Sequence, residues 1–348
     1  MKRSPRLGLL LLNLGSPDAP TIRAVRKYLA EFLGDPRVLV MSRLKRWFVL
    51  HFIILRTRPK NSAHAYQSIW DSKRGSPLIY HSVALRDAII KKTDRFSTVA
   101  IGMRYGNPST ESALDDLLAS GVDQIIVAPL YPQYAMSTTA TALERVYQHL
   151  AKKMYVPPIT IVPPFYDHPA YIQAVAAQGR KVIKDDMFVL FSFHGLPESH
   201  LRLCDPTKQH CLAHPGCCGA ISDANRNCYR AHCFATTRLI TQALGLAPDR
   251  YRVTFQSRLG KEVWTRPYTD ETIIELAREG IRKLVVYSPA FTADCLETIE
   301  ELGSLGRDQF LSAGGQEYQL IPAVNDAEVW VDGLLEIIED SVAISALE

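Results

Sequence analysis

The sequence predicts an α/β fold in which two doubly wound domains each surround a parallel β-sheet. Apolar runs alternate with segments of helical spacing along the whole chain, and this pattern occurs in two blocks that meet near residue 165. The apolar runs are nearly continuous, as expected for strands that are covered by helices on both faces. Strand–helix alternation is typical of βαβ units, and 348 residues with 47% hydrophobic residues are enough for two cores.

Eight short apolar runs are expected to form the strands of the two sheets. The first run follows a basic N-terminus, but it is short and no small-residue cleavage site follows it, so a buried strand explains it better than a signal peptide. The eight runs lie at residues 7–14, 97–103, 124–130, 159–165, 187–193, 251–256, 282–289 and 317–323.

The segments between these runs include four with clear helical spacing, at residues 21–33, 111–121, 170–183 and 269–280. The last of them is expected to begin with Thr269 as its N-cap and to end at Gly280. Residues 1–165 should form the first domain, with a C-terminal helix within 324–348 packing back on it. Residues 166–323 should form the second domain.

Composition narrows the functional classes. The net charge of +4 is modest and spread along the chain, so it gives little support for nucleic-acid binding. No apolar stretch approaches the ~20 residues that span a bilayer. A cytoplasmic protein is therefore expected, and in that compartment clustered cysteines more often bind metal or act in redox chemistry than form disulfides.

Polar residues directly follow three of the expected strands, and they form the first candidate site. Functional groups gather at the carboxyl ends of parallel strands, so two doubly wound domains are expected to place a site in the cleft between them. The strand at 187–193 runs into His194, followed by a Gly-Leu-Pro turn. This imidazole could act as a base or a metal ligand, or it could simply bond a backbone carbonyl in the turn.

A row of carboxylates follows the strand at 282–289. Asp294, Glu297 and Glu301 are spaced by three and four residues, which places them on one face of a helix. Like charges repel, so the row should be either well solvated or functional, and in a cleft it would retain protons near neutral pH or bind a cation. The helix dipole alone could explain Asp294, but it explains the two glutamates less well.

The segment after the strand at 124–130 is rich in hydroxyl and amide groups and leads into a helix. Ser137 or Thr138 is expected to cap that helix, whose N-terminus could hold an anionic group of a ligand. The polar residues of the segment are Tyr131, Gln133, Tyr134, Ser137 and Thr138.

Six stretches, in this order, resemble ferrochelatases, the enzymes that insert ferrous iron into a porphyrin in the last step of haem synthesis. They read LLLNLGSPDAP, AIGMRYGNPSTESA, PLYPQYAMSTT, FSFHGLP, TFQSRLGKEVWTRPYTDETI and FTADCLETIEEL, and the resemblance covers nearly the whole chain. It implies the chelatase fold with two Rossmann-like domains. It also implies a lyase that converts protoporphyrin IX and Fe²⁺ into protohaem and releases two protons.

The resemblance also assigns roles to particular residues. It implies that His194 takes a pyrrole proton or meets the metal at the macrocycle centre, and that Glu297 and Glu301 form an acidic path for protons or incoming iron, with Glu297 near the metal. Relatives that act on coproporphyrin carry a tyrosine where this chain has Leu14, which favours protoporphyrin IX. Six residues fall in segments that line the family's porphyrin pocket: Arg104, Tyr105, Tyr134, Ser137, Gln256 and Trp264.

Two rival functions are left open. One is a non-catalytic iron–sulfur or haem-sensing binding protein on a chelatase scaffold, although a sensor needs no base opposite an acidic path. The other is a chelatase for another metal, such as cobalt, or for another tetrapyrrole, and those relatives lack the run QSRLGKEVW.

Residues 43–60 combine a short apolar run with basic clusters on both sides. A buried core helix explains the apolar run but not the cations, whereas a segment at a membrane surface explains both. This region resembles the segment that forms the lip of the porphyrin pocket in ferrochelatases. Peripheral association with the inner face of the cell membrane is therefore expected.

Four of the seven cysteines lie in the run CDPTKQHCLAHPGCC, shortly after His194. The resemblance implies that residues 204–228 contain an insertion, because relatives without the cluster have a short loop here. Some ferrochelatases hold a two-iron two-sulfur (2Fe–2S) cluster, and in the animal enzymes one ligand comes from the segment where this chain has Met136. The four cysteines of the run are Cys204, Cys211, Cys217 and Cys218.

A 2Fe–2S cluster, a structural zinc ion and a redox or disulfide loop are the alternatives for this run. Adjacent Cys217 and Cys218 fit two irons more easily than one tetrahedral ion, which favours the 2Fe–2S cluster. His210 or His214 could replace one thiol in any of these, and Cys228 stays unassigned.

Overall fold

The computed structural model describes residues 5–260 and 262–345, with side chains described up to residue 343. The chain divides into two compact units. The first comprises the described residues of Met1–Tyr131, Met136–Pro163 and Leu334–Glu348, and the second comprises Pro132–Ala135 and the described residues of Pro164–Gly333. The ends of the expected domains, at residues 1–4 and 346–348, lie outside the described residues.

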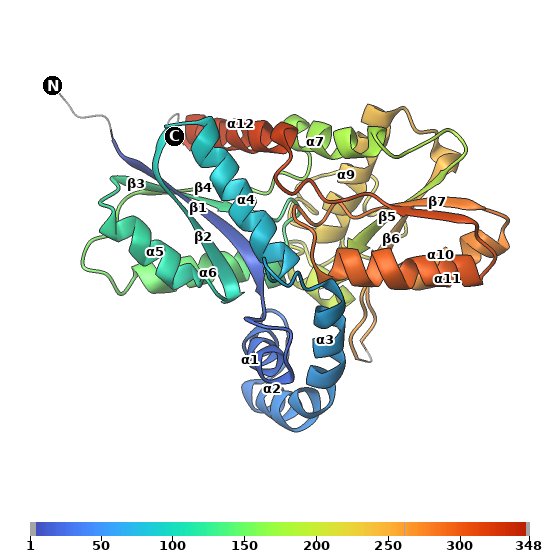
Figure 1. Ribbon diagram of the computed structural model, residues 1–348, viewed down its shortest axis with the longest axis horizontal. Coiled ribbons are helices and arrows are strands. Elements are labelled where there is room, and N and C mark those ends of the chain that lie inside the picture. The colour runs from blue at the N-terminus through green and yellow to red at the C-terminus, as the bar shows by residue number, and fades with distance from the viewer. Residues whose placement is uncertain (1–4, 261, 346–348) are drawn as a thin grey trace. The chain divides into compact units, whose positions relative to one another are not determined.

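The first unit is built on a four-stranded parallel sheet of order β2-β1-β3-β4 (Figure 1). The central strand β1 (Leu7–Ser16) is buried on both faces, and its Leu9–Leu12 run is fully inaccessible. This burial explains why the strand is apolar throughout, since helices cover both faces of the sheet. The other strands are β2 (Phe96–Gly106), β3 (Gln124–Pro129) and β4 (Ile159–Ile161).

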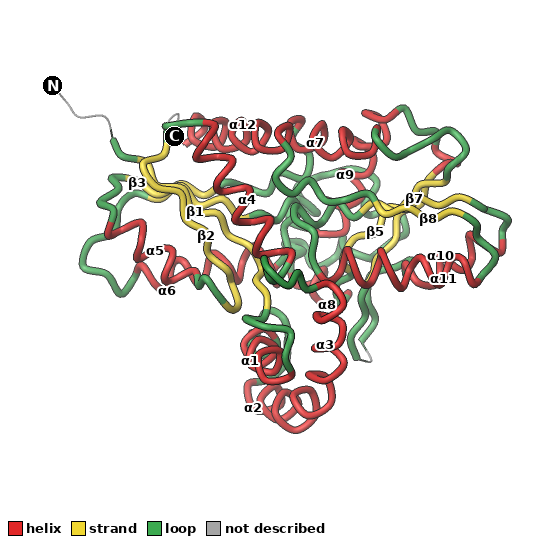
Figure 2. Tube along the Cα trace, viewed as in Figure 1, coloured by secondary structure: helices red, strands yellow, loops and turns green. Residues whose placement is uncertain are grey.

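The helices of this unit include two π-helices. This form is rare in proteins, and where it occurs it often lies at a functional site. Figure 2 shows α1, α2 and α3 grouped together past the carboxyl end of β1. The elements are α1 (Ile22–Phe32), α2 (Arg43–Phe48), the π-helix η1 (Val49–Ile54), α3 (Leu55–Ile69), α4 (Pro77–Lys92), α5 (Thr110–Ala119), the π-helix η2 (Met136–Ala140) and α6 (Thr141–Leu150).

The second unit has its own four-stranded parallel sheet, of order β6-β5-β7-β8. Its central strand β5 (Phe188–His194) pairs with β6 (Tyr251–Gln256), so that His194 lies opposite Gln256 at the carboxyl end of the sheet. The remaining strands are β7 (Lys283–Tyr287) and β8 (Glu317–Leu320). The two parallel sheets confirm the predicted α/β class.

Helices of the second unit connect these strands. They are α7 (Pro169–Arg180), α8 (Glu198–Leu203), α9 (Tyr229–Leu244), the 3₁₀-helix η3 (Pro248–Arg250), α10 (Thr269–Arg278), the π-helix η4 (Glu297–Gly306), α11 (Arg307–Ser312) and α12 (Glu328–Ser345). The last helix, α12, contains the boundary between the two units, which lies between residues 333 and 334.

Two predicted helix caps are wrong. Thr269 is the first residue of α10 rather than its cap, because its hydroxyl bonds Ser192 and Thr254 inside the sheet at 2.8 and 2.9 Å. Ser137 and Thr138 cap no helix either, since both lie within the π-helix η2. The helical segment begins at Met136 in η2, and an anion site at its N-terminus stays a prediction.

The described part of the chain contains no helix that combines the length and the apolar character needed to cross a membrane.

Candidate active site and cysteine loop

His194 ends β5 with its ring held in one orientation. Its Nδ1 bonds the carbonyl oxygen of Gly195 at 2.7 Å, so this nitrogen carries the proton of the neutral ring. The lone pair is then on Nε2, where it can accept a proton. The rings of Trp264 and Phe291 flank the imidazole, with centroids 6.5 and 6.4 Å away.

The turn after His194 needs glycine at position 195. The Gly195 N–H donates to the Gln256 carbonyl at 2.7 Å, and a Cβ at this glycine would lie 2.8 Å from the same oxygen. A larger residue would push β5 and β6 apart at the point where His194 is fixed.

Glu297 and Glu301 both lie on the π-helix η4, and Glu301 is close to His194. Burial raises the pKa of Glu301, while the Ser257 hydroxyl and the nearby His194 oppose this rise and Glu297 adds to it. The Ser257 hydroxyl donates directly to the Glu301 carboxylate, and the backbone of Ser257 has a left-handed φ of 62°. A histidine, a partly buried carboxyl and a second carboxyl therefore lie close together.

Asp294 does not share the environment of the two glutamates, in contrast to the predicted row of three. Its carboxylate accepts hydrogen bonds from Asn325 (2.7 Å) and Thr298 (3.0 Å), and its N–H donates to Asn325 at 2.8 Å. Asp294 lies before η4 begins at Glu297. It holds the loop before η4, so the helix-terminus explanation describes it better than a role in proton transfer.

Gln256 and Trp264 lie in the same unit, and both make hydrogen bonds within the protein. The Gln256 side chain accepts from Ser192 at 2.8 Å and donates to the Glu297 carbonyl at 3.0 Å, so it ties β5 to η4. The Trp264 indole donates to the Leu259 carbonyl at 3.1 Å. Gln256 is buried, which gives it a positioning role for the carboxylates, whereas the Trp264 ring faces His194.

Arg104 and Tyr105, in the first unit, converge on a buried carboxylate. Asp35 accepts hydrogen bonds from the Arg104 guanidinium, the Thr141 hydroxyl and, at 2.9 Å, the Tyr105 hydroxyl. Burial alone would raise the pKa of Asp35, but these donors and the Arg37 N–H outweigh it and lower the pKa. Tyr105 is fully buried, so the structure gives it a role in the core and offers no surface for substrate contact.

Tyr134 and Ser137 belong to different units. The Tyr134 N–H donates to Nδ1 of His232 at 3.2 Å, which fixes the backbone of this segment in the second unit. Ser137 lies in η2 of the first unit and is 9% exposed.

Four buried thiols lie close together in the cysteine loop, residues 204–228. Three of them belong to the predicted set, and the fourth does not. The Sγ atoms of Cys217 and Cys218 are 3.7 Å apart. Cys228, at the N-cap of α9, hydrogen-bonds with the thiols of Cys211 and Cys218. Cys204 is the C-cap of α8, and none of the described thiols is bonded to it. The thiol cluster is therefore Cys211, Cys217, Cys218 and Cys228.

Polar contacts hold the loop around the thiol cluster. Asp205 accepts from the N–H groups of His210 and Cys211, both at 2.8 Å, and Asn225 donates to the Cys217 carbonyl at 2.9 Å. Nε2 of His210 bonds that same carbonyl at 3.0 Å, which leaves it facing the backbone rather than the thiols. The loop is thus folded so that its thiols face one another.

Sequence reasoning missed Ser257, Asp35 and the place of Cys228 in the thiol cluster. Ser257 and Asp35 carry no motif, since a buried polar residue looks like an exposed one in a single sequence. The sequence did place Cys228 within the expected insertion at residues 204–228, but its spacing did not join it to the other thiols.

Relatives of this chain are ferrochelatases. The family model described as ferrochelatase matches residues 6–342. A ferrochelatase of Coxiella burnetii (strain Dugway 5J108-111) is 43% identical over 98% of this chain and 96% of its own length, and one of Legionella pneumophila (strain Paris) is 43% identical over 97% and 100%.

Solved structures support the fold. Bacillus subtilis SirB with Fe³⁺ superposes with a TM-score of 0.55 at 13% identity, covering 99% of this chain and 98% of SirB. The sirohydrochlorin chelatase SirB in complex with cobalt gives 0.52 at 10% identity, covering 97% and 95%. At these identities the likeness concerns the fold alone. The sequence match over nearly the whole chain decides the family: this protein belongs to the ferrochelatases.

Proposed function

We infer that this chain inserts ferrous iron into protoporphyrin IX to give protohaem, with release of two protons. The observation that carries this inference is the group of His194, Glu301 and Glu297 at the carboxyl end of one sheet, in a chain of the ferrochelatase family. Insertion replaces two pyrrole N–H bonds with bonds to iron, so it needs proton acceptors and groups that can replace the water of the incoming ion.

We assign each residue a task that its surroundings support. Nε2 of His194 accepts a pyrrole proton, because Nδ1 is already occupied by the Gly195 carbonyl. Glu301 lies close to His194, and burial raises the pKa of its carboxyl, so this group holds a proton more readily than an exposed glutamate does. Glu297 supplies a carboxylate for the incoming Fe²⁺, since hard oxygen ligands can exchange with its water shell.

The test is an anaerobic assay of the purified protein with protoporphyrin IX and ferrous iron, followed by the absorption of the metalloporphyrin. Formation of protohaem would support the proposal, and tight porphyrin binding without metal insertion would favour the rival binding protein instead. Leu14 packs against the core of the first unit and offers no ligand atom, so we expect coproporphyrin to be a poorer substrate than protoporphyrin.

We further propose that the thiol cluster binds a 2Fe–2S centre through Cys211, Cys217, Cys218 and Cys228. Four converging thiols are the donor set of such a centre, and the Sγ atoms of Cys217 and Cys218, 3.7 Å apart, bring two of these donors together. When bound, the centre supplies one-electron redox chemistry and a cross-link across the loop. Protein-bound iron with equimolar labile sulfide would support this cluster, whereas stoichiometric zinc or a metal-free protein would refute it.

Membrane association is proposed for the surface formed by α2 and η1. Large apolar side chains are exposed there, including Leu44 (78%), Trp47 (51%) and Phe48 (53%), and α2 buries none of its residues. This surface therefore cannot be the interior face of a core helix. Phe48 stacks on Phe52 with centroids 4.9 Å apart, so the aromatic rings form one continuous patch.

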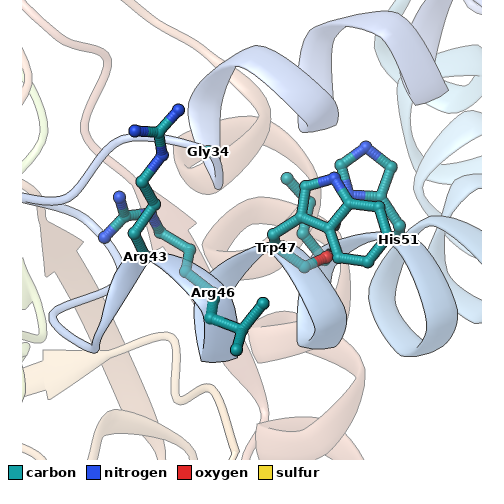
Figure 3. Close-up of a pocket in the computed structure, with 7 residues that line it drawn as sticks. Gly34, Arg43, Arg46, Trp47 and His51 are labelled. Atoms are coloured by element: carbon teal, nitrogen blue, oxygen red, sulfur yellow. Dashed lines mark hydrogen bonds between the residues drawn. The ribbon is translucent and has the colours of Figure 1, made fainter.

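Cations surround this patch, as an anionic lipid surface would require. Figure 3 shows the rings of Trp47 and His51 side by side, with the Arg43 and Arg46 side chains apart from them. These residues help to line a hollow of about 710 Å³. The Arg56 guanidinium adds a further cation, 5.1 Å from the centroid of the Phe52 ring.

The test is co-sedimentation with vesicles that contain phosphatidylglycerol, at low and high salt. The wild-type protein should sediment at low salt, and Trp47→Ser should reduce binding. The matched control is Trp264→Ser, because it removes an indole outside the patch. Equal binding by wild type and Trp47→Ser, or no binding at low salt, would contradict the membrane proposal.

A further inference from the structure

The first turn of α9 contacts both the thiol cluster and the catalytic histidine. Cys228 caps the helix and belongs to the cluster, and Arg230 donates from Nη1 to the Sγ of Cys218 at 3.2 Å. Between them, the Tyr229 hydroxyl donates to the carbonyl oxygen of His194 at 2.9 Å. Adjacent residues of one rigid helical turn thus reach the two sites.

Tyr229 completes the fixation of the peptide that follows His194. The carbonyl of this peptide is held by Tyr229, and its N–H, which belongs to Gly195, is held by the Gln256 carbonyl. These two hydrogen bonds fix the orientation of the peptide. They therefore also fix the direction of the His194 side chain and the position of the Gly195 carbonyl, which bonds Nδ1. Tyr229 is buried, so water does not readily replace its hydroxyl.

His232, one turn further along α9, makes a second connection. Its Nε2 donates to the Arg226 carbonyl of the cysteine loop at 2.7 Å, and its Nδ1 accepts from the Tyr134 N–H at 3.2 Å. The ring also stacks on Tyr166 with centroids 3.8 Å apart. Burial lowers the pKa of His232 to about 4, which keeps the ring neutral with one donor and one acceptor.

We propose that Tyr229 and His232 are positioning residues that couple the thiol cluster to the catalytic site. The inference rests on the proposed function and on the proposed 2Fe–2S centre. A centre bound by Cys228 fixes the start of α9, and that start fixes the backbone of His194 and Tyr134. Because coupling between two sites is reciprocal, porphyrin bound near His194 also changes the surroundings of the iron centre.

The experiment uses the intact, cluster-loaded protein and the electron paramagnetic resonance spectrum of its reduced centre. Metal-free protoporphyrin carries no unpaired electron, so any change in g-values on its addition reports on the iron centre. We expect such a change in wild type and its loss in Tyr229→Phe. Removing this hydrogen bond should also lower kcat on the order of fivefold, with KM nearly constant.

Tyr287→Phe is the matched control. Tyr287 is another buried tyrosine of the second unit, and its hydroxyl donates to a backbone carbonyl, that of Val175, at 3.0 Å. This variant should keep both the spectral change and kcat. An equal fall of kcat in both variants would show a general loss of stability and would overturn the proposal.

Two substitutions of His232 separate its two hydrogen bonds. Asparagine can keep the acceptor for Tyr134 but loses the donor to Arg226, and glutamine can keep the donor but loses the acceptor. Either change should weaken the spectral response to porphyrin, because the connection needs both bonds.

The outcomes distinguish the inference from the proposed function. An active, iron-containing wild type whose spectrum ignores porphyrin would overturn the coupling and leave the function standing. A wild type without metal insertion, or without iron and sulfide, would refute the proposals on which the coupling rests.

Discussion

The hydrogen bond from Ser257 to Glu301 offers a direct test of how the site sets its working pH. Ser257→Ala removes the hydroxyl that stabilises the ionised Glu301 carboxylate. A hydrogen bond to a charged group contributes about 1.5–3 kcal/mol, and each 1.4 kcal/mol is a factor of ten in proton affinity. The Ser257 N–H still contacts the carboxylate, so we take the lower end and expect proton affinity to rise about tenfold.

The sign of the effect follows from the state in which Glu301 acts. As a proton acceptor it must be ionised, and its activity is lost as pH falls through its pKa, which burial already raises. Removing the Ser257 hydroxyl raises this pKa further. The acidic limb of kcat/KM for zinc insertion should therefore move to higher pH, while the rate on the pH plateau changes little.

Ser257→Gly is the control for backbone strain at this position. The φ of 62° favours glycine, and a non-glycine residue there carries a cost of roughly 1–2 kcal/mol. Ser257→Gly should thus shift the pH profile as Ser257→Ala does, but unfold at a higher temperature than the alanine variant. An acidic limb that is unchanged in both variants would refute the assigned role of Glu301.

Two further predictions concern stability and metal content. Asp35→Asn should lower the free energy of unfolding by about 3 kcal/mol in urea titrations at pH 7, because it leaves the Arg104 guanidinium, whose side chain is only 12% exposed, without its carboxylate partner. Asp87→Asn, at an exposed ion pair, should change it by less than about 1 kcal/mol, and equal losses would contradict the role of the buried pair. Cys204→Ser should retain iron and sulfide whereas Cys228→Ser should lose them, and the reverse result would restore the ligand set predicted from sequence.

The stability that Asp35 contributes should also depend on pH. Its pKa is lowered in the folded protein, so this contribution is present above the pKa of an unfolded aspartate and is lost as pH falls through the folded value. The difference between wild type and Asp35→Asn should therefore shrink in acid.

The strands could be predicted because burial on both faces leaves a direct trace in the sequence. All eight apolar runs became strands, although the run at 159–165 shortened to Ile159–Ile161, where Pro163 and Pro164 stop it. Helix ends were harder, since Thr269 uses its hydroxyl in a tertiary contact that local sequence does not reveal.

Some of the site residues could likewise be predicted from the sequence, and others could not. His194 and Glu301 were predictable because they directly follow buried strands, and the structure places them close together. Spacing alone could not separate Asp294 from the glutamates, because the π-helix starts after it. The fourth thiol was missed because Cys228 joins the cluster through the fold of the loop rather than through a motif.

Insertion of ferrous iron by wild type, His194→Ala and His149→Ala tests the central claim most directly. His149 pairs with Asp115 at 2.8 Å in the first unit, whereas β5 belongs to the second, so His149→Ala should retain the wild-type rate. His194→Ala should lose about a hundredfold or more in kcat, the contribution of a positioned general base. Protohaem formation by His194→Ala at the wild-type rate, or none by wild type itself, would contradict the account.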